Sequence, residues 1–167
     1  YTSIDAQSII TASQLNSTNS NGGYVETSGQ TLLMLASINA GRGGMWLIDP
    51  DDILIDSTLA TSITNTLNAS TNVTIATSSC SGVSCNRSVV SSGKGNIYVN
   101  SAISVSSGTG NLTFTPDATT GATYLSANIT TRGSQTYNGD VVVNGSITLT
   151  SGNGAINVTG NVSSGYY

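Results

Sequence analysis

The chain alternates short apolar segments with corners made of Gly, Asn and Ser. The clearest stretch runs from Gly22 to Ile55, where apolar segments lie between glycine pairs and stop at Asp49-Pro50. Pro50 lacks an N–H and has a fixed φ, so a strand must end before it. Because strand side chains alternate between two faces, we expect one apolar face to collect Val25, Leu33, Leu35, Leu47, Ile53 and Ile55.

One phrase recurs along the chain: a strand, a Gly or Asn corner, and a second strand. Gly95–Ile103 matches Gly139–Ile147, and Gly154–Val162 is a looser third copy. A short repeat of this kind is typical of solenoids. The Asn-Gly pairs at 138–139 and 144–145 bracket too few residues for hairpin arms. They therefore favour one face of a coil.

We therefore predict an all-β fold, a right-handed parallel β-helix that spans residues 1–167 as one domain. At about 20 residues per coil, the chain has room for roughly seven or eight coils. Residues 1–21 form a weakly patterned lead-in coil, and residues 78–93 form a loop inserted between coils. The alternative all-β fold is an antiparallel sandwich of short strands, which usually shows more charge alternation on its solvent faces.

The composition restricts the possible functions of the chain more than it restricts the fold. Only 7% of the 167 residues are charged and 5% are aromatic, the net charge is −4, and there is no His. The four basic residues are scattered, so nucleic acid is not an expected partner. No apolar run approaches the ~20 residues of a membrane span. The absence of His excludes His-based triads and dyads, and we expect neither enzymatic activity nor a cofactor.

Two cysteines, Cys80 and Cys85, lie within the predicted loop insertion. The chain offers no further Cys or His to complete a tetrahedral zinc site. We favour a disulfide between them, which indicates an oxidising compartment. The alternative is two free thiols on an exposed loop.

Acidic residues cluster at one corner, at Asp49, Asp51, Asp52 and Asp56. The favoured interpretation is a turn with Asp caps and a solvated acidic rim. The alternatives are a calcium site formed by Asp49, Asp51 and Asp52, or paired carboxylates for glycoside hydrolysis. Catalysis of that kind needs cationic or His partners, and only Arg42 is close in sequence.

Asn-x-Ser/Thr sequons recur, and the glycosylation candidates are Asn72, Asn86, Asn111, Asn128 and Asn144. A chain rich in Asn, Ser and Thr also produces such triplets by chance. Among the aromatic residues, we expect Trp46 to cover a coil corner, and Tyr98, Tyr124 and Tyr137 to flank an outer face.

Three segments resemble the shaft repeats of the filamentous haemagglutinin family. They are Gly23–Gly29, Ser37–Gly41 and Gly44–Pro50, with Val-Glu-Thr-Ser-Gly and Trp-Leu-Ile-Asp-Pro as the more specific phrases. Later segments continue the likeness at Leu67–Ile75, Asn96–Ile103 and Gln135–Gly139. The resemblance covers nearly all of the chain after about residue 20, although an amino-terminal secretion signature of the Asn-Pro-Asn-Gly kind is missing.

The resemblance implies a right-handed β-helix exported by two-partner secretion, with an outer-membrane secretion partner and an extracellular or cell-surface location. It implies a non-catalytic structural segment of an adhesin, with host-cell, carbohydrate or neighbouring-cell surfaces as ligands. An alternative function is a self-assembling fibre subunit, stacked end to end through open strand edges. A third is a polysaccharide-degrading β-helix enzyme. Because the chain begins at Tyr1, we expect a processed protein or part of a longer one.

Overall fold

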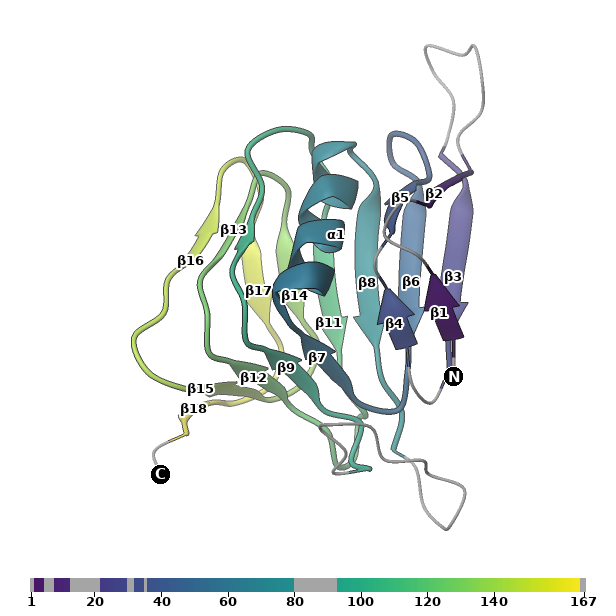
Figure 1. Cartoon of the computed structure of the whole chain (residues 1–167). Coiled ribbons are helices and arrows are strands. Elements are labelled where there is room, and N and C mark those ends of the chain that lie inside the picture. Colours follow the sequence, from purple (N-terminus) through teal and green to yellow (C-terminus); the bar gives the residue numbers. More distant parts are fainter. Residues whose placement is uncertain are drawn as a thin grey trace.

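The chain winds as a parallel β-helix with three faces. The computed structural model describes residues 2–4, 8–12, 22–29, 32–34, 36–79 and 93–165. In Figure 1 the coil axis runs across the view, from the N-terminal strands at the right to the C-terminal strands at the left. Every strand pair among the described residues is parallel. This confirms the predicted solenoid and excludes the antiparallel sandwich.

Each turn of the coil contributes one element to each face. The first face is one six-stranded sheet, made of β3 (Tyr24–Ser28), β6 (Met45–Asp49), β8 (Asn72–Ala76), β11 (Leu112–Thr115), β14 (Gln135–Tyr137) and β17 (Ile156–Val158). The second holds β1 (Thr2–Ile4), β4 (Leu32–Met34), β7 (Ile53–Ile55), β9 (Ile97–Val99), β12 (Thr123–Leu125), β15 (Val141–Val143) and β18 (Val162–Ser164). The third holds β2 (Ile9–Thr11), β5 (Ser37–Asn39), α1 (Ser57–Asn68), β10 (Ile103–Ser104), β13 (Ile129–Thr131) and β16 (Leu149–Ser151).

At three elements per turn, these nineteen elements make six turns and one strand of a seventh within the described residues. The number is close to the predicted seven or eight coils, although the turns differ in length. Asn111 and Ser134 occupy matching corners 23 residues apart, whereas Asn72 and Asn111 do so 39 residues apart. Residues 80–92 of the longer turn lie outside the described residues, so the loop insertion at 78–93 stays a prediction.

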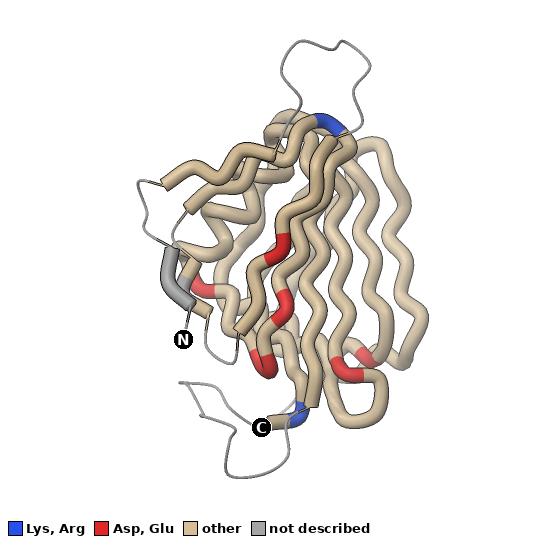
Figure 2. Tube along the Cα trace, turned by 90° about the vertical axis from the view of Figure 1, so that its right-hand side faces the viewer, with Lys and Arg blue, Asp and Glu red and all other residues tan. Residues whose placement is uncertain are grey.

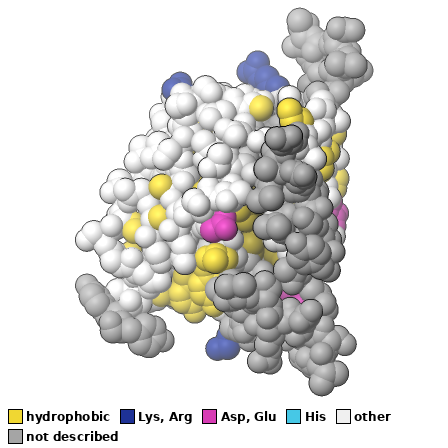
Figure 3. All heavy atoms as spheres, viewed as in Figure 1, with side chains coloured by type: hydrophobic (Ala, Val, Ile, Leu, Met, Phe, Trp, Pro, Cys, Tyr) yellow, Lys and Arg dark blue, Asp and Glu magenta, His cyan; other side chains and the backbone are white. Residues whose placement is uncertain are grey.

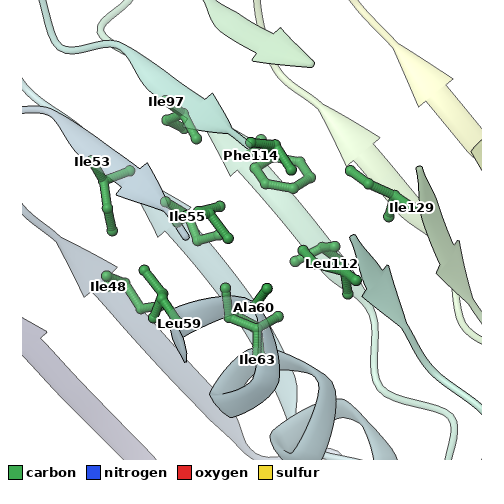
Figure 4. Packing of buried hydrophobic residues seen from close by; sticks show 14 of the residues in the cluster. Ile48, Ile53, Ile55, Leu59, Ala60, Ile63, Ile97, Leu112, Phe114 and Ile129 are labelled. Carbon is green, nitrogen blue, oxygen red and sulfur yellow. The ribbon is translucent and has the colours of Figure 1, made fainter. Parts of the chain in front are cut away.

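The core consists of side-chain columns that run along the coil axis. Strand pairing places Ile48, Ile75 and Phe114 in direct succession on the first face, all fully buried. Figure 4 shows such residues of several turns meeting in one interior, together with Leu59, Ala60 and Ile63 of α1. Burial of apolar surface stabilises a fold by about 25 cal/mol per Å². Each turn therefore stabilises its neighbours, which is the basis of cooperativity in a solenoid.

The sequence analysis did not predict α1. Asp56 caps this helix, because its carboxylate accepts hydrogen bonds from the backbone N–H groups of Thr58 at 3.0 Å and Leu59 at 2.9 Å. Leu59, Ile63 and Leu67 recur at the helical spacing and are buried against the core. The helix ends before Ser70, which adopts a left-handed φ of 63°. Figure 1 shows α1 on the third face, where the neighbouring turns place a strand.

Polar side chains of α1 take over the hydrogen bonds of the strand that it replaces. The buried Thr66 Oγ1 accepts from Ile38 N of β5 at 3.2 Å, and Thr71 Oγ1, just after the helix, accepts from Ala40 N at 3.1 Å. On the opposite side, Asn68 Oδ1 accepts from the backbone N–H groups that follow β10, those of Ser106 and Ser107. Unpaired buried N–H groups are costly, so a helix rich in Ser, Thr and Asn fits this position.

Two sequence-based placements on β6 were wrong. Trp46 does not cover a corner: its side chain is fully buried, and its indole N–H donates to Thr27 Oγ1 at 3.0 Å. Because Trp46 and Ile48 point inward, the strand parity places Leu47 on the outer face rather than in the core. Val25, Ile53 and Ile55 do lie on the inner side, and the side chains of Leu33 and Leu35 lie outside the described residues.

Candidate functional surfaces

The acidic corner after β6 is hydrogen-bonded to the next turn of the coil. Asp52 uses both carboxylate oxygens to accept from the next turn, with Oδ2 2.8 Å from Gly93 N and Oδ1 2.5 Å from Asn96 N. Desolvation, then the nearby charges of Glu26 and Asp51, raise the pKa of Asp49. Desolvation and the charge of Asp52 raise the pKa of Asp51. The carboxyl groups of Asp49, Asp51 and Asp52 therefore lie close together at this corner.

The calcium and glycoside-hydrolysis alternatives for this corner stay predictions. Among the described residues, no group of three or more acidic, His or Cys side chains is placed to hold a metal ion. A catalytic carboxylate must reach a substrate, whereas the oxygens of Asp52 accept from backbone amides. The carboxylate of Asp52 therefore links two successive turns of the coil. Figure 2 shows how few charged residues the coil carries elsewhere.

Two aspartates bind the described residues on either side of the predicted loop insertion. Asp117 Oδ2 accepts from Ser79 N at 3.0 Å on the outgoing side, and Asp52 accepts from Gly93 N on the returning side. Hydrogen bonds from Ser79 N, from the Thr119 hydroxyl and from neighbouring amides hold the pKa of Asp117 well below its usual value. Cys80 and Cys85 lie outside the described residues, so their disulfide stays a prediction.

Corner Asn and Asp side chains join successive turns. Each accepts, through Oδ1, a hydrogen bond from a backbone N–H one turn further on: Asn72 from Asn111 N at 2.9 Å, Asn96 from Ala122 N at 2.9 Å, Asn111 from Ser134 N at 2.8 Å, Asn128 from Thr148 N at 2.8 Å and Asp140 from Asn161 N at 2.8 Å. The amide side chains thereby extend the strand ladders around the corners, where backbone pairing stops.

The glycosylation candidates differ in which side-chain atom makes a hydrogen bond. An N-glycan is attached at Nδ2, and the Nδ2 groups of Asn72 and Asn144 donate to Gly43 O at 3.3 Å and Ser126 Oγ at 3.2 Å. Asn111 and Asn128 are exposed and bond through Oδ1, which a glycan leaves intact. They are the better candidates, while Asn86 lies outside the described residues.

The predicted aromatic surface is only partly correct. Tyr98 and Tyr124 are neighbours on the outer side of β9 and β12, with ring centroids 4.9 Å apart and ring planes at 19°. Leu54 and Val142 continue this column on either side. Figure 3 shows hydrophobic atoms gathered at the lower edge, where Figure 1 places these strands. Because the two tyrosine rings face each other, the pair is better suited to stabilising the sheet than to stacking on a sugar.

Tyr137, in contrast, points into the core. It is 1% exposed and stacks on Phe114, with ring centroids 5.1 Å apart. Its hydroxyl donates to Gln135 Oε1 at 2.8 Å, and Gln135 Nε2 donates to Thr150 O at 2.7 Å and Thr131 Oγ1 at 3.2 Å. Desolvation raises the pKa of Tyr137 far above its ordinary value. Sequence alone missed this buried polar cluster, because a Gln at an inward strand position looks like a surface residue.

The described part of the chain contains no helix long and apolar enough to cross a bilayer. Comparison of the chain with protein-family models, curated proteins and solved structures finds no match. The geometry therefore identifies a mostly parallel-strand protein with stacked sheets, a β-solenoid, and the likeness to filamentous haemagglutinin shafts rests on the sequence motifs.

Proposed function

We propose that this chain is a structural segment of a secreted or surface-exposed bacterial adhesin or filament, and that it performs no catalysis. The observation that carries the proposal is the continuity of the core. One inward column passes through every turn of the first face without a gap: Thr27, Ile48, Ile75, Phe114, Tyr137 and Val158. A coil in which every turn packs on the next is stiff along its axis.

The outer surface supports the same role. Its strands carry mostly Thr, Ser and Asn, and in one column Thr74, Thr113 and Thr136 lie side by side on successive turns. Hydroxyl and amide groups keep an elongated coil soluble with few charges. Proposed ligands are host-cell, carbohydrate or neighbouring-cell surfaces, and an outer-membrane partner would export the chain.

Stiffness can be measured between the first and last strands of the six-stranded sheet. Glu26 and Asn157 occupy the same outer column and are both exposed. With Cys80 and Cys85 changed to Ser, spin labels at Glu26→Cys and Asn157→Cys lie five strand spacings apart, about 24 Å between backbones. We expect a single narrow distance distribution by pulsed electron resonance. A broad or multimodal distribution would contradict the role of a rigid spacer.

Location needs a separate experiment. Antibodies against the purified chain should label intact cells of the source organism, and brief protease treatment of those cells should remove the label. Labelling only after the cells are permeabilised would contradict a secreted or surface-exposed segment.

A further inference from the structure

Asn-Gly pairs are chemically labile places in a protein chain. Three lie within the described residues, at 138–139, 144–145 and 153–154, and a fourth, at 21–22, begins outside them. In such a pair the backbone nitrogen of Gly attacks the side-chain amide carbon of the preceding Asn, because the two close a five-membered ring and Gly carries no side chain that hinders the attack. The attacking nitrogen must give up its proton, so the hydrogen bond made by each Gly N–H affects which Asn reacts.

In two of the described pairs the Gly N–H donates a hydrogen bond. Gly139 N donates to Thr159 Oγ1 on the next turn at 3.1 Å, and Gly154 N donates to Ser151 Oγ at 3.1 Å. The nitrogen can attack only after this bond is broken, so the free energy of one hydrogen bond is added to the barrier. The bonds therefore protect the Asn residues that precede Gly139 and Gly154.

The N–H of Gly145 makes no hydrogen bond with any described residue. The same corner behaves in this way in turns that have another turn on either side. Ser101, Ala127 and Gly145 each lie two residues past the end of a strand of the second face, after β9, β12 and β15. The N–H groups of Ser101 and Ala127 likewise have no partner among the described residues. The corner itself therefore leaves this N–H out of the strand ladder, whatever follows the last turn.

We propose that Asn144 is a deamidation site of this coil, and that Asn138 and Asn153 are protected. Gly145 N loses its proton to hydroxide and bonds to Cγ of Asn144. The Cγ–Nδ2 bond then breaks, and Nδ2 takes a proton from water and leaves as ammonia, which regenerates the hydroxide. Water opens the resulting succinimide ring at Cγ to give Asp, or at the backbone carbonyl carbon to give isoaspartate.

The two products affect the corner differently. Asn144 Nδ2 donates to Ser126 Oγ at 3.2 Å, and a hydroxyl that accepts from an amide can instead donate to a carboxylate, so Asp fits the same place. Isoaspartate adds one atom to the main chain between β15 and β16, which disturbs the pairing of Leu149 on β16 with Ile129 on β13. Either product takes the net charge of the chain from −4 to −5.

Peptide mapping by mass spectrometry tests the order of reaction in the full chain, incubated at mildly alkaline pH either folded or in urea. The three described pairs share the tryptic peptide that begins at Gly133, and fragment ions locate each conversion. In the folded chain, Asn144 should convert roughly twofold to tenfold faster than Asn138 and Asn153, the factor that corresponds to one hydrogen bond. In urea the three should convert at similar rates, because the hydrogen bonds that distinguish them are gone.

Two variants test the cause. Ser151→Ala frees Gly154 N and should speed the conversion of Asn153 roughly twofold to tenfold, while Asn144 keeps its wild-type rate. Thr159→Val should do the same for Asn138, and circular dichroism checks that each variant keeps its strands.

The proposal is overturned if Asn144 converts no faster than the other two in the folded wild-type chain. It is also overturned if folded variants with a freed Gly N–H leave the rate at the preceding Asn unchanged. The wild-type comparison decides by itself if a variant fails to fold. The reaction is set by one corner of the coil, so its outcome is independent of the proposed structural role.

Discussion

Thr123 offers a test of how the core is held together. It lies on β12, in an inward column between Ile97 and Val141, and it is 1% exposed. Its Oγ1 atom is buried and has no hydrogen-bond partner within the described residues. Burying a hydroxyl without a partner costs about 1–3 kcal/mol. Thr123→Val keeps the shape and the strand propensity, removes that cost, and places a methyl group against two apolar neighbours.

We therefore expect Thr123→Val to raise the free energy of unfolding by about 1–3 kcal/mol. Urea unfolding followed by circular dichroism measures it, and with a slope of about 2 kcal/mol per M the midpoint moves up by roughly 0.5–1.5 M. A decrease in the midpoint, or no change, would refute the reasoning, since either result means that the hydroxyl has a partner.

The neighbouring face supplies a matched control. Thr131 on β13 is also 1% exposed, but its Oγ1 donates to Gly133 O at 2.7 Å and accepts from Gln135 Nε2 at 3.2 Å. The same change, Thr131→Val, removes two hydrogen bonds of about 0.5–1.5 kcal/mol each and should lower the free energy of unfolding by about 1–3 kcal/mol. If the two Thr→Val changes alter the free energy of unfolding in opposite directions, the difference comes from hydrogen bonding, because the change in side-chain shape is the same.

Three further predictions concern the helix and the loop insertion. Asp56→Ala removes the helix cap and should cost about 1 kcal/mol, measured by urea unfolding, whereas Asp56→Asn should recover most of it. Thr66→Val leaves Ile38 N without its acceptor and should cost about 1–3 kcal/mol, so an unchanged midpoint would show that the helix does not satisfy that strand. Hydrogen bonds, first of all the one from Ser79 N, lower the pKa of Asp117 in the folded state. Ionised Asp117 therefore stabilises the fold above its unfolded pKa of about 3.9, and this stabilisation is lost as the pH falls. The stability difference between wild type and Asp117→Asn, followed by thermal unfolding against pH, should therefore shrink below about pH 4.

Much of the fold follows from local chemistry along the chain. Alternation of Val, Ile and Leu with Thr and Asn predicted strands. Glycines such as Gly139, which has a φ of 105°, predicted where the chain turns. Segments too short for hairpins required parallel stacking. Pro50 ended β6 at Asp49, as its missing N–H required. The sequence also located the acidic corner, although it did not reveal that Asp52 accepts from backbone amides of the next turn.

The helix is the main feature that this chemistry did not reveal. A signal was present, in the Asp56 cap and the spacing of Leu59, Ile63 and Leu67. Ser, Thr and Asn have modest helix propensity, and in isolation they favour turns or strands. The helix is stable because Thr66 and Asn68 replace the missing strand for the neighbouring turns on either side of it.

The sequence by itself determined that this chain is a wound parallel coil, because alternation and corner residues act over a few neighbours. Only the tertiary structure decided that Tyr137 and Gln135 lie inside while Tyr98 and Tyr124 lie outside, and that α1 stands in a strand's place. A shift of one residue reverses the face on which a strand side chain lies. The register between turns is fixed by contacts 21 to 39 residues apart, which no local pattern contains.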